Sequence, residues 1–139
     1  MSLRFLLDTN VVSEPLRPAP NRQVLDHLRR HQTEIAIAAL TWHELWFGCE
    51  RLPQSAKRTA IETYLNEVIA VSMPVLAYDE RAAEWHAAER ARLRAVGKTP
   101  SFVDGQIAAI AVVHELTLIT LNGVDFQDFS GLTATNWAG

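Results

Sequence analysis

Asp8 is the first residue of the chain whose type and position could do chemistry. It directly follows the short apolar run Phe5–Leu7, which is typical of a buried strand, and the polar pair Thr9 and Asn10 comes next. In open α/β sheets, ligands bind outside the carboxyl ends of the strands, so an acid here would lie at the mouth of a site. The same aspartate also suits the N-cap of a helix that begins near Val11, and this stretch alone does not decide between the two functions.

Asp104 lies in the first turn of a helix that Pro100 and Ser101 are expected to open. An acid in a first turn interacts favourably with the helix dipole, which contributes about 0.3–1 kcal/mol. Its spacing from Ile107 and Ala108, however, places it on the apolar stripe that faces the interior. A buried, unpaired carboxylate costs several kcal/mol, so we expect a cation or a water-filled cavity beside Asp104.

Glu44 and Asp125 also have ordinary structural explanations. Glu44 lies three residues after Thr41, which is the spacing of a capping box at the start of a helix. Asp125 comes shortly after a strand predicted over residues 117–121, where a turn residue is common. Both acids nevertheless lie near the end of a strand or the start of a helix, as the other two acids do.

Four carboxylates from separate elements are therefore expected to meet at one edge of a sheet. Two carboxylates 4 Å apart repel by about 4 kcal/mol at an effective dielectric of about 20, so such a cluster implies a divalent cation. A zinc protease is excluded, because Phe47 stands where the motif that starts at His43 needs its second histidine. Oxygen ligands favour Mg²⁺ or Mn²⁺, which with few protein ligands usually support phosphoryl transfer or phosphodiester cleavage.

Arg90, Arg94 and Lys98 recur at four-residue spacing towards the end of a predicted helix and form a basic stripe. Such a stripe is most often a solvated face. The alternative is a track for the phosphates of RNA or a docking surface for an acidic partner. Trp42 and Trp46 share a helix face, and such pairs more often pack in a core or a subunit interface than stack on bases.

Strands and helices alternate along the chain, which predicts an α/β fold with a parallel sheet and helices on both faces. The strands are expected at residues 5–7, 34–40, 74–78 and 117–121, with a last edge strand at 132–135. The helices are expected at residues 11–16, 21–31, 41–52, 56–69, 79–97 and from 100 onward. These elements have to bring the acids to one edge.

A chain of 139 residues, 48% of them hydrophobic, fits a single domain over residues 1–139 with a full core. Its apolar runs are too short for a signal sequence or a membrane span, and Cys49 has no second cysteine to pair with. We therefore expect a cytoplasmic protein without membrane contact. The net charge of −3 neither favours nor excludes a nucleic-acid partner, because acids can be held in a metal site.

Four segments resemble the PIN-domain toxins of the VapC and FitB type. They are LLDTNVVSEPLRP at the N-terminus, TWHEL around residue 44, FVDGQIAAIA, and LITLNGVDF near the end. The resemblance runs over nearly the full length. It implies a compact three-layer α/β/α PIN-like domain with a central parallel sheet of four to five strands. It also implies an endoribonuclease that depends on Mg²⁺ or Mn²⁺.

The same resemblance implies roles for individual residues. The acids that it assigns to the metal are Asp8, Glu44 and Asp104. The fourth catalytic position differs among relatives, some of which carry an aspartate at the position of Asn122, whereas others use the acid that matches Asp125. Thr120 and Asn10, together with Asn122, would be polar groups that orient the acids.

The resemblance further implies a cognate antitoxin, usually a small DNA-binding protein whose C-terminal segment blocks the site. Contact with operator DNA would occur only through that antitoxin, the substrate would be RNA, and the toxin would be a homodimer.

Two other functions stay open. A catalytically weakened module that serves as a scaffold for an antitoxin or a nucleic acid agrees with Asn122 and with Leu121, where relatives frequently have arginine. A phosphatase with Asp8 as covalent nucleophile agrees less well, because Asn10 stands where an acid would protonate the leaving group.

Overall fold

The central sheet forms from five short segments of the chain. They are β1 (Phe5–Leu7), β2 (Ile35–Ala38), β3 (Val75–Leu76), β4 (Thr117–Ile119) and β5 (Ala134–Thr135). In the computed structural model, which describes residues 2–139, all five pair in parallel in the order β3-β2-β1-β4-β5. The strand order reverses direction between β1 and β4, so the carboxyl ends of these two strands form the switch point at which α/β sheets bind ligands.

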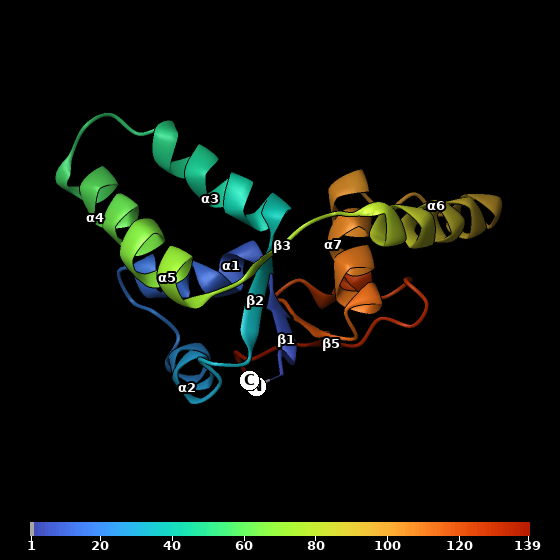
Figure 1. Ribbon diagram of the computed structural model, residues 1–139, viewed down its shortest axis with the longest axis horizontal. Coiled ribbons are helices and arrows are strands. Elements are labelled where there is room, and N and C mark those ends of the chain that lie inside the picture. The colour runs from blue at the N-terminus through green and yellow to red at the C-terminus, as the bar shows by residue number, and fades with distance from the viewer. Residues whose placement is uncertain (1) are drawn as a thin grey trace.

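Helices cover both faces of the sheet and give the expected three layers (Figure 1). One face carries α1 (Thr9–Val12), the 3₁₀ turn η1 (Glu14–Leu16), α2 (Arg22–Arg30), α3 (Ala39–Glu50), α4 (Ala56–Tyr64), the π-helical segment η2 (Leu65–Ile69) and α5 (Ala70–Ser72). The other carries α6 (Glu80–Ala95) and α7 (Phe102–Val113), and the 3₁₀ turn η3 (Gly123–Phe126) follows β4. Among the helices of residues 2–139, none has the length and apolar content that crossing a bilayer requires.

Side-chain alternation along the strands divides the interior into two cores. Leu6 and Leu118 point towards α7, where they pack with Ala108. Leu7 and Ile119 point to the opposite face and pack under η2 and its neighbours. Each large side chain that is fully buried in this way contributes about 1.5–3 kcal/mol, so the two cores hold β1 and β4 rigidly in the middle of the molecule. The predicted α/β fold is confirmed.

The start of α3 differs from the prediction. The helix begins at Ala39, its N-cap is Ala38 without a side-chain hydrogen bond, and Thr41 lies fully buried inside it. The Thr41 hydroxyl has no hydrogen-bond partner within residues 2–139, so the capping box expected from Thr41 and Glu44 is wrong. The physical reason is that β2 leads into α3 without a loop, and the sheet rather than a capping side chain fixes where the helix begins.

The connection between α6 and α7 is a tight turn. Gly97 has φ +78°, its N–H donates to the Arg94 carbonyl at 3.1 Å, and the Lys98 N–H donates to the Leu93 carbonyl at 2.9 Å. This pattern is a Schellman motif, which needs a left-handed residue directly after the helix and therefore favours glycine. Ser101 then caps α7 by accepting a hydrogen bond from the Asp104 N–H at 3.0 Å.

A histidine of α6 packs directly on the backbone of α7. The His86 ring is 3% exposed and forms a hydrogen bond of 2.9 Å through Nδ1 with the Tyr78 hydroxyl. A Cβ atom added to Gly105 would lie 2.2 Å from Nε2 of His86, closer than any real contact allows. Gly105 is thus required for the two helices to approach, and the approach fixes the first turn of α7, which carries Asp104.

We expect Gly105→Ala to lower the free energy of unfolding by about 2 kcal/mol, because the added methyl group overpacks the contact with His86. In a His86→Ala background the same substitution should be close to neutral, because the space is then free and alanine is the better helix former. Urea denaturation of the four members of this double-mutant cycle measures the coupling. Equal costs of Gly105→Ala in both backgrounds would contradict this packing.

Glu89 anchors the end of α6 to the segment after η3. Its carboxylate is 9% exposed, accepts two hydrogen bonds from the Arg92 guanidinium, and accepts a third from the Ser130 N–H at 2.6 Å. The Arg92 hydrogen bonds are the main cause that holds the pKa of Glu89 below its ordinary 4.5, and the Ser130 hydrogen bond lowers this pKa further, whereas burial opposes both.

Because this pKa is depressed in the folded state, the contribution of Glu89 to stability is present above pH 4.5 and is lost as the pH falls through the folded value. We expect Glu89→Gln to destabilise the protein by on the order of 1 kcal/mol at pH 7. The difference from the unsubstituted protein should shrink towards zero as the pH falls below 4, as urea denaturation across this range would measure. Glu84→Gln, at an exposed position of the same helix, is the control and should show no such trend.

Candidate active site

Asp8 lies at the carboxyl end of β1 and is 9% exposed. One carboxylate oxygen accepts a hydrogen bond from the Thr9 N–H at 2.9 Å, so Asp8 is the N-cap of α1. The other accepts a hydrogen bond from the Thr120 hydroxyl at 2.8 Å. Thr120 follows β4 and is 1% exposed, so this hydrogen bond is buried and joins the ends of the two central strands. Asp8 therefore caps a helix and also lies at the switch point of the sheet.

The other polar residues expected to orient the acids differ in what they contact. The Asn122 N–H donates to the Thr120 hydroxyl at 3.0 Å, so Asn122 supports Asp8 indirectly and through its backbone. Asn10 lies in α1, half-buried, and its side chain makes no hydrogen bond to another residue of the part of the chain described here. Of these three residues, only Thr120 forms a side-chain hydrogen bond with an acid within residues 2–139.

The charges of two other acids affect the pKa of Asp104. It is half-buried at the start of α7, and burial is the largest cause that raises the pKa of its carboxyl group. The hydrogen bond with Ser101 lowers this pKa, whereas the negative charges of Asp125 and Asp8 raise it. Acids from three distant parts of the sequence are therefore close enough for two of them to disfavour ionisation of the third.

Asp125 lies in η3 and is exposed. It lines, with Asp104, an open hollow of about 480 Å³ at the carboxyl edge of the sheet. The remaining residues of this hollow are Lys98, Thr99, Pro100, Ser101, Val124 and Asp128. Water and ions can therefore reach both carboxylates.

Glu44 is not among the acids whose charge raises the pKa of Asp104. It lies in the second turn of α3, its side chain is 50% exposed, and its nearest charged neighbour is His43, with Nδ1 3.7 Å from the carboxylate. Across residues 2–139 no three Asp, Glu, His or Cys side chains converge closely enough to hold a metal ion together. The close cluster of Asp8, Asp104 and Glu44 expected from the sequence is thus not seen, in keeping with the repulsion between like charges.

The segment around Glu44 carries the aromatic pairs noted in the sequence. Trp42 and Trp46 meet edge to face with centroids 5.9 Å apart and pack half-buried against the core under η2. This agrees with the expected packing role. Phe47 remains 50% exposed, with the Arg51 guanidinium 5.0 Å from the centre of its ring.

The predicted basic stripe is not uniform. Lys98 forms an ion pair of 2.9 Å with Asp128, and Arg90 lies over the Phe102 ring at 5.1 Å. Neither Arg90 nor Arg94 has a carboxylate partner among residues 2–139. All three side chains are exposed, and of the three only Lys98 forms an ion pair within residues 2–139.

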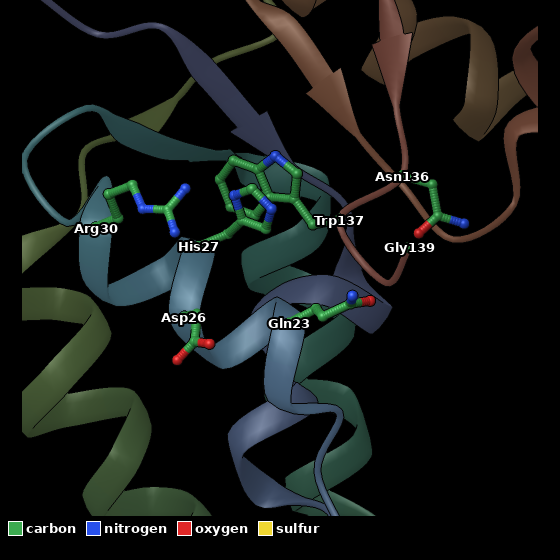
Figure 2. Close-up of a pocket in the computed structure, with 7 residues that line it drawn as sticks. All are labelled: Gln23, Asp26, His27, Arg30, Asn136, Trp137 and Gly139. Carbon is green, nitrogen blue, oxygen red and sulfur yellow. The ribbon is translucent and has the colours of Figure 1, made fainter.

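A second hollow lies at the opposite, amino end of the sheet (Figure 2). In Figure 2 the His27 ring is stacked on Trp137, with centroids 4.8 Å apart, and Trp137 also contacts Phe5 at the start of β1. Burial is the main cause that lowers the pKa of His27, and the charges of Arg30 and His31 lower it further. This hollow is separate from the acids, which follow the strands at their other end.

Glu14 is a second buried acid, besides Glu89, that the sequence does not reveal. Glu14, 2% exposed in η1, accepts a hydrogen bond from the Asn21 N–H at 3.0 Å and lies 3.7 Å from the Arg17 guanidinium. It fixes the turn between η1 and α2. The nearby Pro15, Pro18 and Pro20 indicate a turn in the sequence, but nothing in it shows that this acid is buried.

Comparison with known proteins agrees with this architecture. The sequence pattern of the PIN domain matches residues 5–132. Toxin FitB of Neisseria gonorrhoeae is 37% identical over 119 residues, which cover 84% of this chain and 86% of that protein. VapC ribonuclease Y4jK of Sinorhizobium fredii is 34% identical over 126 residues, which cover 88% of this chain and 90% of that protein.

Among solved structures, that of FitAB bound to the IR36 DNA fragment superposes with a TM-score of 0.88 and 31% identity, over 97% of this chain and 96% of the other. The acids at the switch point of a parallel sheet and the match over most of the length lead to one conclusion. The chain belongs to the PIN-domain family.

Proposed function

We propose that this protein is the toxin of a toxin–antitoxin pair and an endoribonuclease that hydrolyses RNA phosphodiester bonds with Mg²⁺ or Mn²⁺. The observation that carries the proposal is the position of Asp8 at the switch point, hydrogen-bonded to Thr120, together with the open hollow that Asp104 and Asp125 line. The names of two relatives, a toxin and a ribonuclease, give the reaction class.

The donor atoms suit a hard cation. Asp8, Asp104 and Asp125 offer carboxylate oxygens only, which are the ligands that Mg²⁺ and Mn²⁺ prefer. A positive charge among them would also remove the repulsion that disfavours ionisation of Asp104. Asp8, Asp104 and Glu44 would hold the ion, and Asp125 would complete the set of catalytic acids. When bound, the ion would supply an activated water and stabilise charge on the phosphate.

The surrounding residues prepare the acids for this role. The Thr120 hydroxyl and the Thr9 N–H each donate to a different oxygen of Asp8, which fixes the orientation of its carboxylate. Ser101 holds the first turn of α7 and thereby the position of Asp104. The exposed Asp125 is accessible for proton exchange with solvent.

A cognate antitoxin would bind this protein and block the hollow at the acids, and contact with operator DNA would be made by the antitoxin. The toxin would act as a homodimer in the cytoplasm, where its RNA substrate is.

We expect Asp8→Asn and Asp104→Asn each to reduce RNA cleavage by at least about 100-fold, because each removes a negative charge from the metal ligands. Asparagine is as good an N-cap as aspartate, so the fold around residue 8 should be retained. The measurement is the rate of cleavage of a structured RNA by pure protein with Mg²⁺ or Mn²⁺. Asp26→Asn, an exposed acid on α2, is the matched control and should cleave normally. Full activity of Asp8→Asn would refute the proposal.

A weakened module that acts as a scaffold is the second candidate, and the outward position of Glu44 favours it. Calorimetric titration with Mn²⁺ separates the two functions. For a nuclease we expect binding to the unsubstituted protein that Asp104→Asn weakens at least about tenfold. A protein that binds no Mn²⁺, with no change on substitution, would instead be a scaffold.

A further inference from the structure

Two hollows that share three lining residues lie along the connection between α6 and α7, and together they define a path. The first, of about 100 Å³, is lined by Arg90, Arg94 and Phe102 together with Lys98, Thr99 and Pro100. The last three residues also line the hollow that contains Asp104 and Asp125. The path thus runs from cations at one end to acids at the other, with Lys98 where the two hollows meet.

The turn after α6 creates this arrangement. Because Gly97 reverses the chain, Lys98 and Thr99 line a hollow together with Arg90 and Arg94 of α6 before α7 begins. Arg90 and Arg94 are four residues apart and share one face of that helix end. The side chains of α6 are in this way brought next to the first turn of α7, which carries Asp104.

Only some of the basic side chains near the path have an acidic partner within residues 2–139. Arg92 is paired with Glu89 and Lys98 with Asp128, whereas Arg90 and Arg94 have no carboxylate partner in residues 2–139. These two guanidinium groups therefore remain available for an anion from outside.

Arg90 is also held in place. Its guanidinium lies 5.1 Å from the centre of the Phe102 ring, and the opposing contact of that ring is with buried His86, centroids 4.7 Å apart. Phe102 is 50% exposed, so its ring is accessible at the surface beside Arg90. A cation–π contact of this kind orients the guanidinium while its N–H groups stay free to donate.

A polyanion in a narrow path fits these observations. The smaller hollow is large enough for one phosphate group but too small for a duplex. Proteins commonly bind single-stranded RNA in such grooves. The acids at the far end repel a phosphate unless a cation is bound beside them. The arginines would therefore bind the strand, and cleavage would take place at the acids.

We propose that Arg90, Arg94 and Lys98 form a phosphate track that guides single-stranded RNA into the acid site. This inference rests on the proposed nuclease function. It adds where the strand lies on the protein and in which direction from the acids it extends.

The test measures binding separately from cleavage. In the Asp8→Asn background, the fluorescence anisotropy of a labelled, unstructured 12-nucleotide RNA is followed at several KCl concentrations. Adding Arg90→Ala and Arg94→Ala should weaken binding about tenfold and lower the slope of log Kd against log salt by about 1.4, since each phosphate contact on a single strand contributes about 0.7. The control, Arg22→Ala with Arg29→Ala, removes the same charge from exposed positions of α2 and should leave both quantities unchanged.

Phe102→Leu provides a second, charge-neutral variant. It keeps an apolar side chain against His86 but removes the ring that orients Arg90, so Kd should rise about threefold with the salt slope unchanged. If Kd and the salt slope are unchanged in the double arginine variant, the phosphate track is overturned. If the protein that retains Asp8 still cleaves RNA, the proposed nuclease function stands. The phosphate track would also be overturned if the two arginine substitutions abolished binding to an acidic protein and left RNA binding unchanged. Failure of the unsubstituted protein to cleave RNA would instead refute the function on which it rests.

Discussion

The hydrogen bond from Thr120 to Asp8 ties together the ends of the two central strands, and the geometry of the acid site depends on it. These residues meet because β1 and β4 are neighbours where the strand order reverses, although they lie 112 positions apart in the chain. Both oxygens of Asp8 already have a donor, Thr9 or Thr120, so this carboxylate cannot swing away from other acids. Burial is the main cause that raises the pKa of Asp104, and the charges of Asp125 and Asp8 raise it further.

Much of the fold could be predicted from the sequence because its signals are local. Asn21, Asp79 and Ser101 lie at the predicted starts of three helices, and each accepts a capping hydrogen bond from a backbone N–H. The isoleucines and alanines of β2 alternate in the sequence, and they separate into the two cores of the structure. For Asp8 the sequence offered a capping role and a site role as alternatives, whereas the structure shows the cap and the switch-point position in one residue.

What the sequence could not show depends on contacts between distant residues. Thr41 is a favourable capping residue, but β2 passes straight into α3 and leaves it buried in the helix. The exposure of the Glu44 side chain, 50%, could likewise not be read from the sequence. The need for glycine at position 105 arises from His86, nineteen positions earlier, and no local pattern contains it. A π-helical segment inside the predicted helix over residues 56–69 likewise leaves no trace in the apolar spacing.

The outer strands of the sheet have a further consequence. β3 and β5 are two residues long each, and Pro74 directly precedes β3. Short borders with a proline beside them offer too few free N–H and C=O groups to recruit a strand from another polypeptide, which protects such sheets from aggregation. Growth of the sheet across subunits is therefore disfavoured, which leaves the helices and loops as the surfaces for assembly.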